Sequence, residues 1–282
     1  MKRVIVCDSG LGGLNIARRM CNYSKAHEKC ELIYFNAYPD AGMGFNKIKE
    51  TRKQEELFQV VLESMKKFSP DCCVIACNTL SIIYRKLARW YTPPFPVITI
   101  VDAALDAMYG TLSKDEESSL LILGTQTTVN SGFYQEKLIE KGIDRKRIYG
   151  TPCPGLATLL ESDPASPEVA DMIADFASAT PEIPGRTIYL AWCCTHFEFA
   201  GEVWVKEFGK VFPDKEIRII NPNEYAAGDF AAQKCSYLSR INFFPGAKEA
   251  MSRCFAGSKI AEAIEEASAD EKLFEFDVKK YF

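Results

Sequence analysis

The chain has 282 residues, of which 47% are hydrophobic, and its formal net charge is −4. This length and apolar content are sufficient for two packed lobes, while the acidic balance provides no basic surface for nucleic acid. No apolar stretch approaches the roughly 20 residues of a membrane-spanning helix, and the run after Met1-Lys2-Arg3 is too short for a secretion signal. We therefore expect a cytoplasmic protein without nucleic-acid or membrane partners.

The first strand and the turn after it are the first candidate for a ligand site. Val4–Cys7 forms a short apolar run, and the glycine-rich segment Asp8–Gly13 leads from it into a helical pattern. The glycines have neither the spacing of a Walker loop nor that of the dinucleotide fingerprint, so nucleotide binding is a minor alternative. Asp8 and Ser9 either cap the helix or lie at the carboxyl end of the strand, facing a ligand.

The same alternation of strand and helix continues along the chain. Further strands are expected at residues 31–35, 74–77, 97–100, 120–123, 148–149, 187–191 and 217–220, and helices at 47–68, 82–90, 103–109, 224–237 and 247–267. This pattern predicts an α/β fold with parallel sheets. The proline-rich segment Thr92–Pro96 is expected to connect two lobes. We assign residues 1–95 and 210–282 to the first lobe and residues 96–209 to the second.

An internal repeat supports two pseudo-symmetric lobes. Asp8 and Cys77 end two predicted strands, and they are as far apart in the sequence as Thr125 and Cys194, which end two others. The strand near Ile33 falls on the strand near Ile148 under the same shift. Since ligands bind at the carboxyl ends of parallel strands, we expect the active site in the cleft between the lobes.

Eleven cysteines are spread along the chain, an odd number that does not indicate a disulfide framework. Two of them stand at equivalent strand ends, Cys77 before Asn78-Thr79 and Cys194 before Thr195-His196. Two thiols on opposite sides of one substrate suit the removal of a proton from one face of a carbon and its return on the other face. A free thiol has a pKa of about 8.5, so each one needs help near neutral pH.

Neighbouring residues supply that help. Asp8 is the candidate assistant of Cys77, and His196 is the candidate assistant of Cys194. Hydrogen-bond donors would hold the carboxylates of the substrate; they are Ser9, Asn78, Thr79 and Thr195. This chemistry requires no cofactor and no metal.

Three motifs identify a family. The stretches Asp8-Ser9-Gly10-x-Gly-Gly-Leu, Ala76-Cys77-Asn78-Thr79-x-Ser81 and Cys194-Thr195-His196 resemble the signature stretches of glutamate racemase, in the aspartate/glutamate racemase superfamily. The segments from Gly124 to Tyr134 and from Cys153 to Glu161 also resemble the second lobe of that family. The ordered set covers nearly the whole chain.

The resemblance implies two α/β lobes with glutamate between them, a homodimer, and a supply of D-glutamate for peptidoglycan. It implies Cys77 and Cys194 as the two bases, the first acting on the D-isomer and the second on the L-isomer. Asp8 and His196 are implied both as assistants and as substrate contacts. Further substrate contacts are implied at Ser9, Met43, Gly44, Asn78, Thr79, Thr128 and Thr195.

Three positions depart from the family pattern. Gly42-Met43-Gly44 stands where the family has Pro-Tyr-Gly, Cys193 replaces a glycine, and Asn221-Pro222 replaces Asp-Ser. These changes bear on the identity of the substrate more than on the mechanism. The nearest alternative is therefore a related racemase or isomerase acting on aspartate or another small acid.

Other readings of these residues stay open. Cys77 and His196 also suit ordinary core positions, Glu161 is either a surface carboxylate or part of the site, and His27 is expected at the surface. A metal-binding or redox protein would use the same cysteines, but adjacent cysteines on a strand point to opposite faces and no Cys-x-x-Cys pair occurs. A relative that has kept the fold only for binding is a further alternative.

Overall fold

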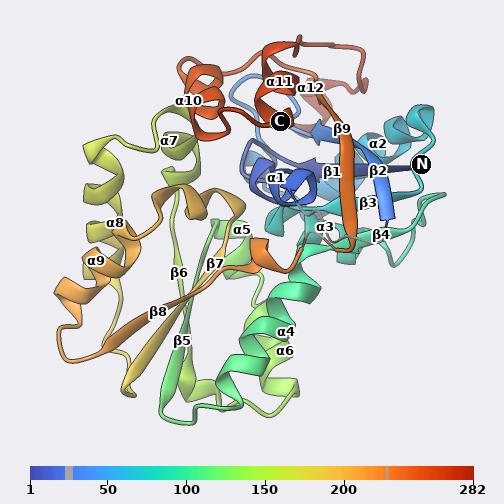
Figure 1. Ribbon diagram of the computed structural model, residues 1–282. Helices are drawn as coiled ribbons and strands as arrows, with labels where there is room; N and C mark the ends of the chain where they lie inside the picture. The colour runs from blue at the N-terminus through green and yellow to red at the C-terminus, as the bar shows by residue number, and fades with distance from the viewer. Residues whose placement is uncertain (23–27, 227) are drawn as a thin grey trace.

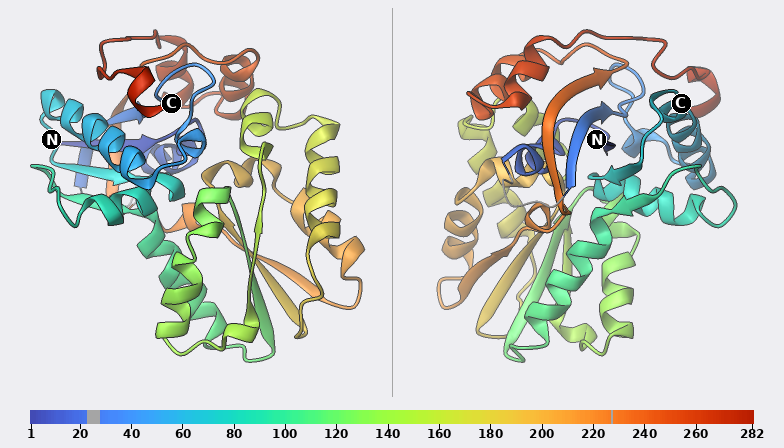
Figure 2. Two further views of the ribbon diagram at one scale, coloured as in Figure 1. Left: turned by 180° about the vertical axis from the view of Figure 1, so that it is seen from behind. Right: turned by 45° about the vertical axis from the view of Figure 1, so that its right-hand side comes forward.

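The computed structural model describes residues 1–22, 28–226 and 228–282, so the expectation for His27 lies outside the described residues. Two parallel sheets form two lobes, as Figures 1 and 2 show. This confirms the predicted α/β class. The strands of the first sheet, in spatial order, are β4 (Val97–Thr99), β3 (Cys72–Ile75), β1 (Lys2–Asp8), β2 (Glu28–Asn36) and β9 (Phe230–Ser239). Those of the second are β6 (Ile148–Pro152), β5 (Ser118–Gly124), β7 (Thr187–Cys193) and β8 (Glu216–Ile220).

The two sheets share one strand order. Reading β4-β3-β1-β2 against β8-β7-β5-β6 places β1 opposite β5, β2 opposite β6 and β3 opposite β7. This is the equivalence that the internal repeat predicts, and β9 is an addition to the first sheet. The central strands β5 and β7 are buried along their whole length, as expected of parallel strands covered on both faces.

Helices cover both faces of each sheet. The α-helices are α1 (Leu14–Asn22), α2 (Thr51–Met65), α3 (Asn78–Leu87), α4 (Ile100–Leu112), α5 (Gln126–Asn130), α6 (Phe133–Glu140), α7 (Leu156–Ser162), α8 (Pro167–Ala179), α9 (Val203–Val211), α10 (Ala247–Cys254), α11 (Lys259–Glu265) and α12 (Val278–Tyr281). Helices α2 and α3 bury their apolar stripes against one face of the first sheet, whereas α7, α8 and α9 cover one face of the second.

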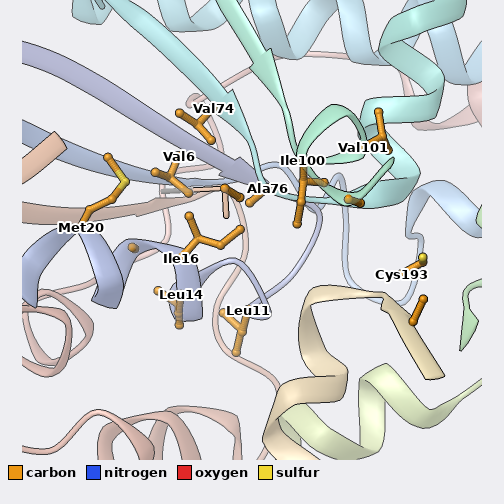
Figure 3. Packing of buried hydrophobic residues seen from close by; sticks show 14 of the residues in the cluster. Val6, Leu11, Leu14, Ile16, Met20, Val74, Ala76, Ile100, Val101 and Cys193 are labelled. Carbon is orange, nitrogen blue, oxygen red and sulfur yellow. The ribbon is translucent and has the colours of Figure 1, made fainter. Parts of the chain in front are cut away.

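One apolar cluster joins the lobes behind the site. Figure 3 shows Val6 and Val74 of the first sheet packed toward Ile16 of α1, and the same cluster continues through α4 to Cys193 at the end of β7. Described residues on both sides of the cleft therefore share one core. This anchors the strand ends that carry the two thiols.

The strand pairing corrects both expected lobe boundaries. Strand β4 pairs with β3 in the first sheet, so the chain crosses over after Thr99 and not at Pro96. Strand β8 pairs with β7 in the second sheet, so the return crossing follows Ile220 and not residue 210. The prolines end the preceding helix, but the next strand still pairs with the first sheet before the chain crosses. In the same way, β8 completes the second sheet before the chain returns.

The expected helix at residues 224–237 is wrong, because residues 230–239 form strand β9. The alanines near its start favour a helix, yet the segment pairs with the open edge of β2 along its length. The helical pattern at 247–267 is interrupted near Gly257, whose φ of +71° ends the continuous helix and separates α10 from α11.

Candidate active site

A cavity of about 330 Å³ lies at the carboxyl ends of strands from both sheets. Cys77 follows β3 and Cys194 follows β7, and both thiols line the cavity while only 7% of each residue is exposed. Each cysteine precedes a helical segment, which is α3 after Cys77 and the 3₁₀ segment Thr195–Ala200 after Cys194. The predicted pair of thiols is thus brought to one enclosed space.

Cys77 is surrounded by hydrogen-bonding groups, and no cation among the described residues acts on its pKa. Its Sγ lies 3.2 Å from Ser9 Oγ, and the backbone N–H of Leu80, in the first turn of α3, donates to it. Burial and the nearby carboxylate of Asp8 raise the pKa of Cys77 to about 12. At neutral pH this thiol carries its proton.

Asp8 lies near Cys77 and has one bonded and one unbonded carboxylate oxygen among the described residues. Thr195 Oγ1 donates to Asp8 Oδ2 at 2.9 Å, and the N–H of Gly13 donates to the same carboxylate. Its Oδ1 has no partner among the described residues. Burial raises the pKa of Asp8 from 3.8 to about 6, although His196 and Thr195 favour the ionised form. A buried acceptor of this kind is suited to an ammonium group or to a thiol proton.

Cys194 has an imidazole beside it. His196 Nδ1 lies 3.5 Å from Cys194 Sγ, and His196 Nε2 lies 2.6 Å from Glu161 Oε1. Burial lowers the pKa of His196, but Cys194 and Glu161 outweigh it and raise the pKa well above its usual range. The imidazole thus lies between the thiol of Cys194 and the carboxylate of Glu161, where it can exchange a proton with either group.

His196 Nε2 has two neighbours that suit its two charge states. The imidazolium donates Nε2–H to Glu161, whereas the neutral ring with its proton on Nδ1 accepts the N–H of Gly12, which lies 3.0 Å from Nε2. Glu161 also accepts the N–H of Leu11 at 2.7 Å. The glycine-rich turn therefore supports the imidazole–carboxylate pair of the opposite lobe.

Close packing explains the glycines of that turn. A Cβ on Gly12 would overlap Thr195 and His196, and one on Gly10 would overlap Glu161. A Cβ on Gly13 would lie 2.9 Å from the carboxylate of Asp8. The missing side chains of this turn let it approach the second lobe closely.

Asn78 offers an unpartnered donor to the cavity. The hydroxyl of Tyr134, from α6, donates to Asn78 Oδ1 at 2.5 Å, and Asn78 Nδ2 has no partner among the described residues. Cys193 is a second neighbour of the same hydroxyl. Because Oδ1 is occupied, the amide presents its NH₂ group, and not its carbonyl, to an incoming ligand.

The remaining predicted contacts divide into two groups. Ser9, Gly44, Thr79 and Thr195 line the cavity with the residues above. Thr128 lies behind the wall, where its hydroxyl is 3.1 Å from Thr125 Oγ1. Met43, a predicted substrate contact, is not among the residues that line this cavity and lines a separate surface hollow with Lys49 and Lys53.

Some lining residues were absent from the expected site. Tyr38, Lys47 and Phe244 contribute to the walls, and Glu161, left undecided from the sequence, contacts His196 directly. Phe244 follows β9 and packs edge-on against Tyr38, with ring centroids 5.4 Å apart. No local motif marks Tyr38, Lys47 or Phe244, since only the fold brings them to the cavity.

Within residues 1–22, 28–226 and 228–282, no group of three or more histidine, cysteine or acidic residues is arranged to hold a metal ion. Nor does any helix there have the length and apolarity required to cross a membrane.

Residues 12–199 match the model of the Asp/Glu/Hydantoin racemase family. The chain belongs to this family. Curated relatives include the glutamate racemase of Campylobacter jejuni, 28% identical over 216 residues, which are 73% of this chain and 78% of the relative. Another is the glutamate racemase of Aquifex pyrophilus, 26% identical over 220 residues, which are 76% and 77% of the two chains.

Solved structures have the same fold. A glutamate racemase isoform from Bacillus anthracis matches with a TM-score of 0.69 and 19% identity, over 95% of this chain and 96% of that one. The glutamate racemase of Francisella tularensis, solved in complex with D-glutamate, matches with a TM-score of 0.68 and 17% identity, over 89% of this chain and 92% of that one.

Proposed function

We propose that this protein interconverts L- and D-glutamate by two-base proton transfer at the α-carbon, with Cys77 and Cys194 as the bases. The observation that carries the proposal is the placement of these thiols at equivalent strand ends, both opening into one cavity of about 330 Å³. Each thiol has its own titratable neighbour. Membership in the racemase family and the names of the curated relatives support the choice of reaction and substrate.

The free polar atoms of the cavity suggest how an amino acid is held. Asn78 Nδ2 and the N-terminus of α3 donate hydrogen bonds to the α-carboxylate, while Asp8 Oδ1 accepts one from the ammonium group. When the α-proton leaves, negative charge spreads onto the carboxylate. Donors already directed at that group stabilise the charge without reorganisation.

Proton transfer then proceeds from one thiol to the other. As a thiolate, Cys194 removes the α-proton of one isomer, and the protonated Cys77 returns a proton to the opposite face. The reverse reaction begins with Cys77 as the thiolate, its proton having passed to Asp8, and with Cys194 as the thiol, after it has taken a proton from His196. His196 and Glu161 hold the charge at Cys194 as it changes.

The wider role follows from the same proposal. D-glutamate produced by a cytoplasmic enzyme of this kind would supply peptidoglycan synthesis, and we propose a homodimer as the working form. No cofactor enters the scheme, because the two thiols, the aspartate and the imidazole account for every proton movement.

The test is exchange of the α-proton in deuterated buffer with L-glutamate, D-glutamate and both aspartates offered separately. We expect exchange with inversion for glutamate, and loss of the inversion in both Cys77→Ser and Cys194→Ser. Exchange only with aspartate would transfer the proposal to that substrate. Absence of exchange with all four, in folded and reduced protein, would refute it.

A further inference from the structure

We propose that Tyr38 and Lys47 form a subsite at the cavity mouth that binds the side-chain carboxylate of a dicarboxylic substrate. The proposal rests on the proposed function for the choice of glutamate, but the subsite itself is argued from the cavity. Both residues lie in the segment between β2 and α2, where the sequence departs from the family pattern.

The charge distribution of the cavity leads to Lys47. Among the described lining residues it is the one lysine or arginine, whereas Asp8 and Glu161 are buried acids on the inner wall. A second carboxylate placed near those acids would be repelled. The side-chain carboxylate of glutamate therefore points away from them, toward the mouth.

Lys47 is available for such a contact. It ends the 3₁₀ turn Phe45–Lys47, is exposed, and makes no ion pair within the described part of the chain, whereas nearby Lys53 is paired with Glu50 at 3.0 Å. Lys47 lines both the cavity and the outer hollow that holds Met43. An unpaired ammonium at this boundary attracts an anion entering from solvent.

Tyr38 supplies the second donor. The N–H of Gly44 donates to the hydroxyl oxygen of Tyr38, so this backbone donor is already used. The hydroxyl keeps its own proton for a ligand. Phe244 packs edge-on against the ring, and a Cβ on Gly44 would lie 3.1 Å from it, so the ring is held on two sides. Burial raises the pKa of Tyr38, which keeps the donor protonated at neutral pH.

The consequence is selectivity for two carboxylates. The α-carboxylate takes the donors at α3, and the distal carboxylate takes Tyr38 and Lys47. A substrate with a methyl group at the distal end would leave the ammonium and the hydroxyl without a partner. Such a substrate binds less tightly, although its α-carbon still reaches both thiols.

The experiment compares two pairs of ligands that differ only at that end: glutarate with pentanoate, and L-glutamate with L-norvaline. In Lys47→Met we expect the Kd of glutarate and the KM of L-glutamate to rise about 10-fold, as for loss of a charge-assisted hydrogen bond, with kcat within about 3-fold of the wild type. The values for pentanoate and L-norvaline should stay unchanged. In Tyr38→Phe we expect the Kd of glutarate and the KM of L-glutamate to rise about 5-fold.

Two lysine variants serve as controls. Lys47→Arg keeps the charge and should restore most of the affinity for glutarate. Lys49→Met removes a charge from the outer hollow but not from the cavity lining, and should leave all four ligands unaffected. An equal loss for pentanoate, or no loss for glutarate in Lys47→Met, would overturn the subsite.

Binding and turnover separate this proposal from the racemase proposal. Glutarate binding requires no chemistry, so a Lys47-dependent Kd without α-proton exchange would support the subsite and refute the racemase. Exchange of the α-proton of L-glutamate with a KM that does not change in Lys47→Met would support the racemase and refute the subsite.

Discussion

The two thiol sites of this molecule lie at equivalent strand ends, yet their surroundings differ. Cys77 has a hydroxyl, a backbone N–H and the carboxylate of Asp8, whereas Cys194 has His196 backed by Glu161. Burial and the carboxylate of Asp8 keep Cys77 protonated, with a pKa of about 12, whereas the pKa of His196 beside Cys194 is raised well above its usual range. A symmetric fold thus surrounds its two thiols with different titratable groups.

Removing either thiol tests this asymmetry most directly. We expect Cys77→Ala and Cys194→Ala each to reduce racemisation about 10³-fold, because each removes one of two general acid–base groups. Each variant should still exchange the α-proton of one isomer, Cys77→Ala that of L-glutamate and Cys194→Ala that of D-glutamate. Proton NMR in deuterated buffer measures both reactions, and exchange of both isomers by one variant would contradict two separate faces.

Glu161→Gln should affect one direction more than the other. Its carboxylate accepts the proton of His196 Nε2 at 2.6 Å, and it has no direct contact with Cys77. We expect kcat to fall about 100-fold when Cys194 is the base and about 10-fold or less when Cys77 is the base. Because the equilibrium constant of a racemisation is unity, kcat/KM stays equal in the two directions, so KM changes together with kcat. Initial rates from each pure isomer by circular dichroism measure the split. Equal losses would assign Glu161 a purely structural role.

Asp8→Asn should change stability as well as activity. The folded pKa of Asp8, about 6, lies above the ordinary value of 3.8, so the wild type loses stability as pH rises from about 4 to 6. Because asparagine does not titrate, the free energy of unfolding of the variant should rise relative to that of the wild type over this pH interval, by at most about 3 kcal/mol. Urea unfolding at several pH values measures the difference. Asp106→Asn, whose side chain is 78% exposed, should give a nearly pH-independent difference.

Tyr134→Phe is expected to have the smallest effect. The variant removes the hydroxyl that occupies Asn78 Oδ1, which lets the amide rotate and present its carbonyl to the substrate. We expect KM to rise about 5- to 10-fold with a smaller change in kcat, as for one lost hydrogen bond. Tyr149→Phe removes a hydroxyl that bonds Lys146 O at the surface and should leave KM unchanged. A selective fall in kcat would place Tyr134 nearer to the chemistry.

The parts of the site that lie at strand ends were predictable from sequence. Cys77, Asp8 and Cys194 follow apolar runs, and the period of the strands together with the internal repeat places them at one edge. Parallel sheets put ligands at that edge whatever else the chain does. The α/β class and the equivalence of the two sheets follow from the same signals.

The parts that depend on loops and long-range packing were not predictable. Met43 lines a separate hollow beside the cavity, and Phe244 reaches the cavity because β9 pairs with β2. Alanine content favours a helix at residues 230–237, but pairing with the open edge of β2 makes this segment a strand. This is a tertiary effect that local propensity does not include. Glu161 stayed undecided since its partner is distant in the sequence.

The return of β9 to the first sheet has a consequence for synthesis on the ribosome. Every strand of the second sheet has been synthesised once Ile220 is added, whereas the outer edge of β2 stays unpaired until residues 230–239 have followed. Until then the nascent chain exposes an unpaired, largely apolar strand, the kind of edge that promotes association between chains. We therefore expect the second lobe to fold first and the first lobe to be the part that chaperones protect.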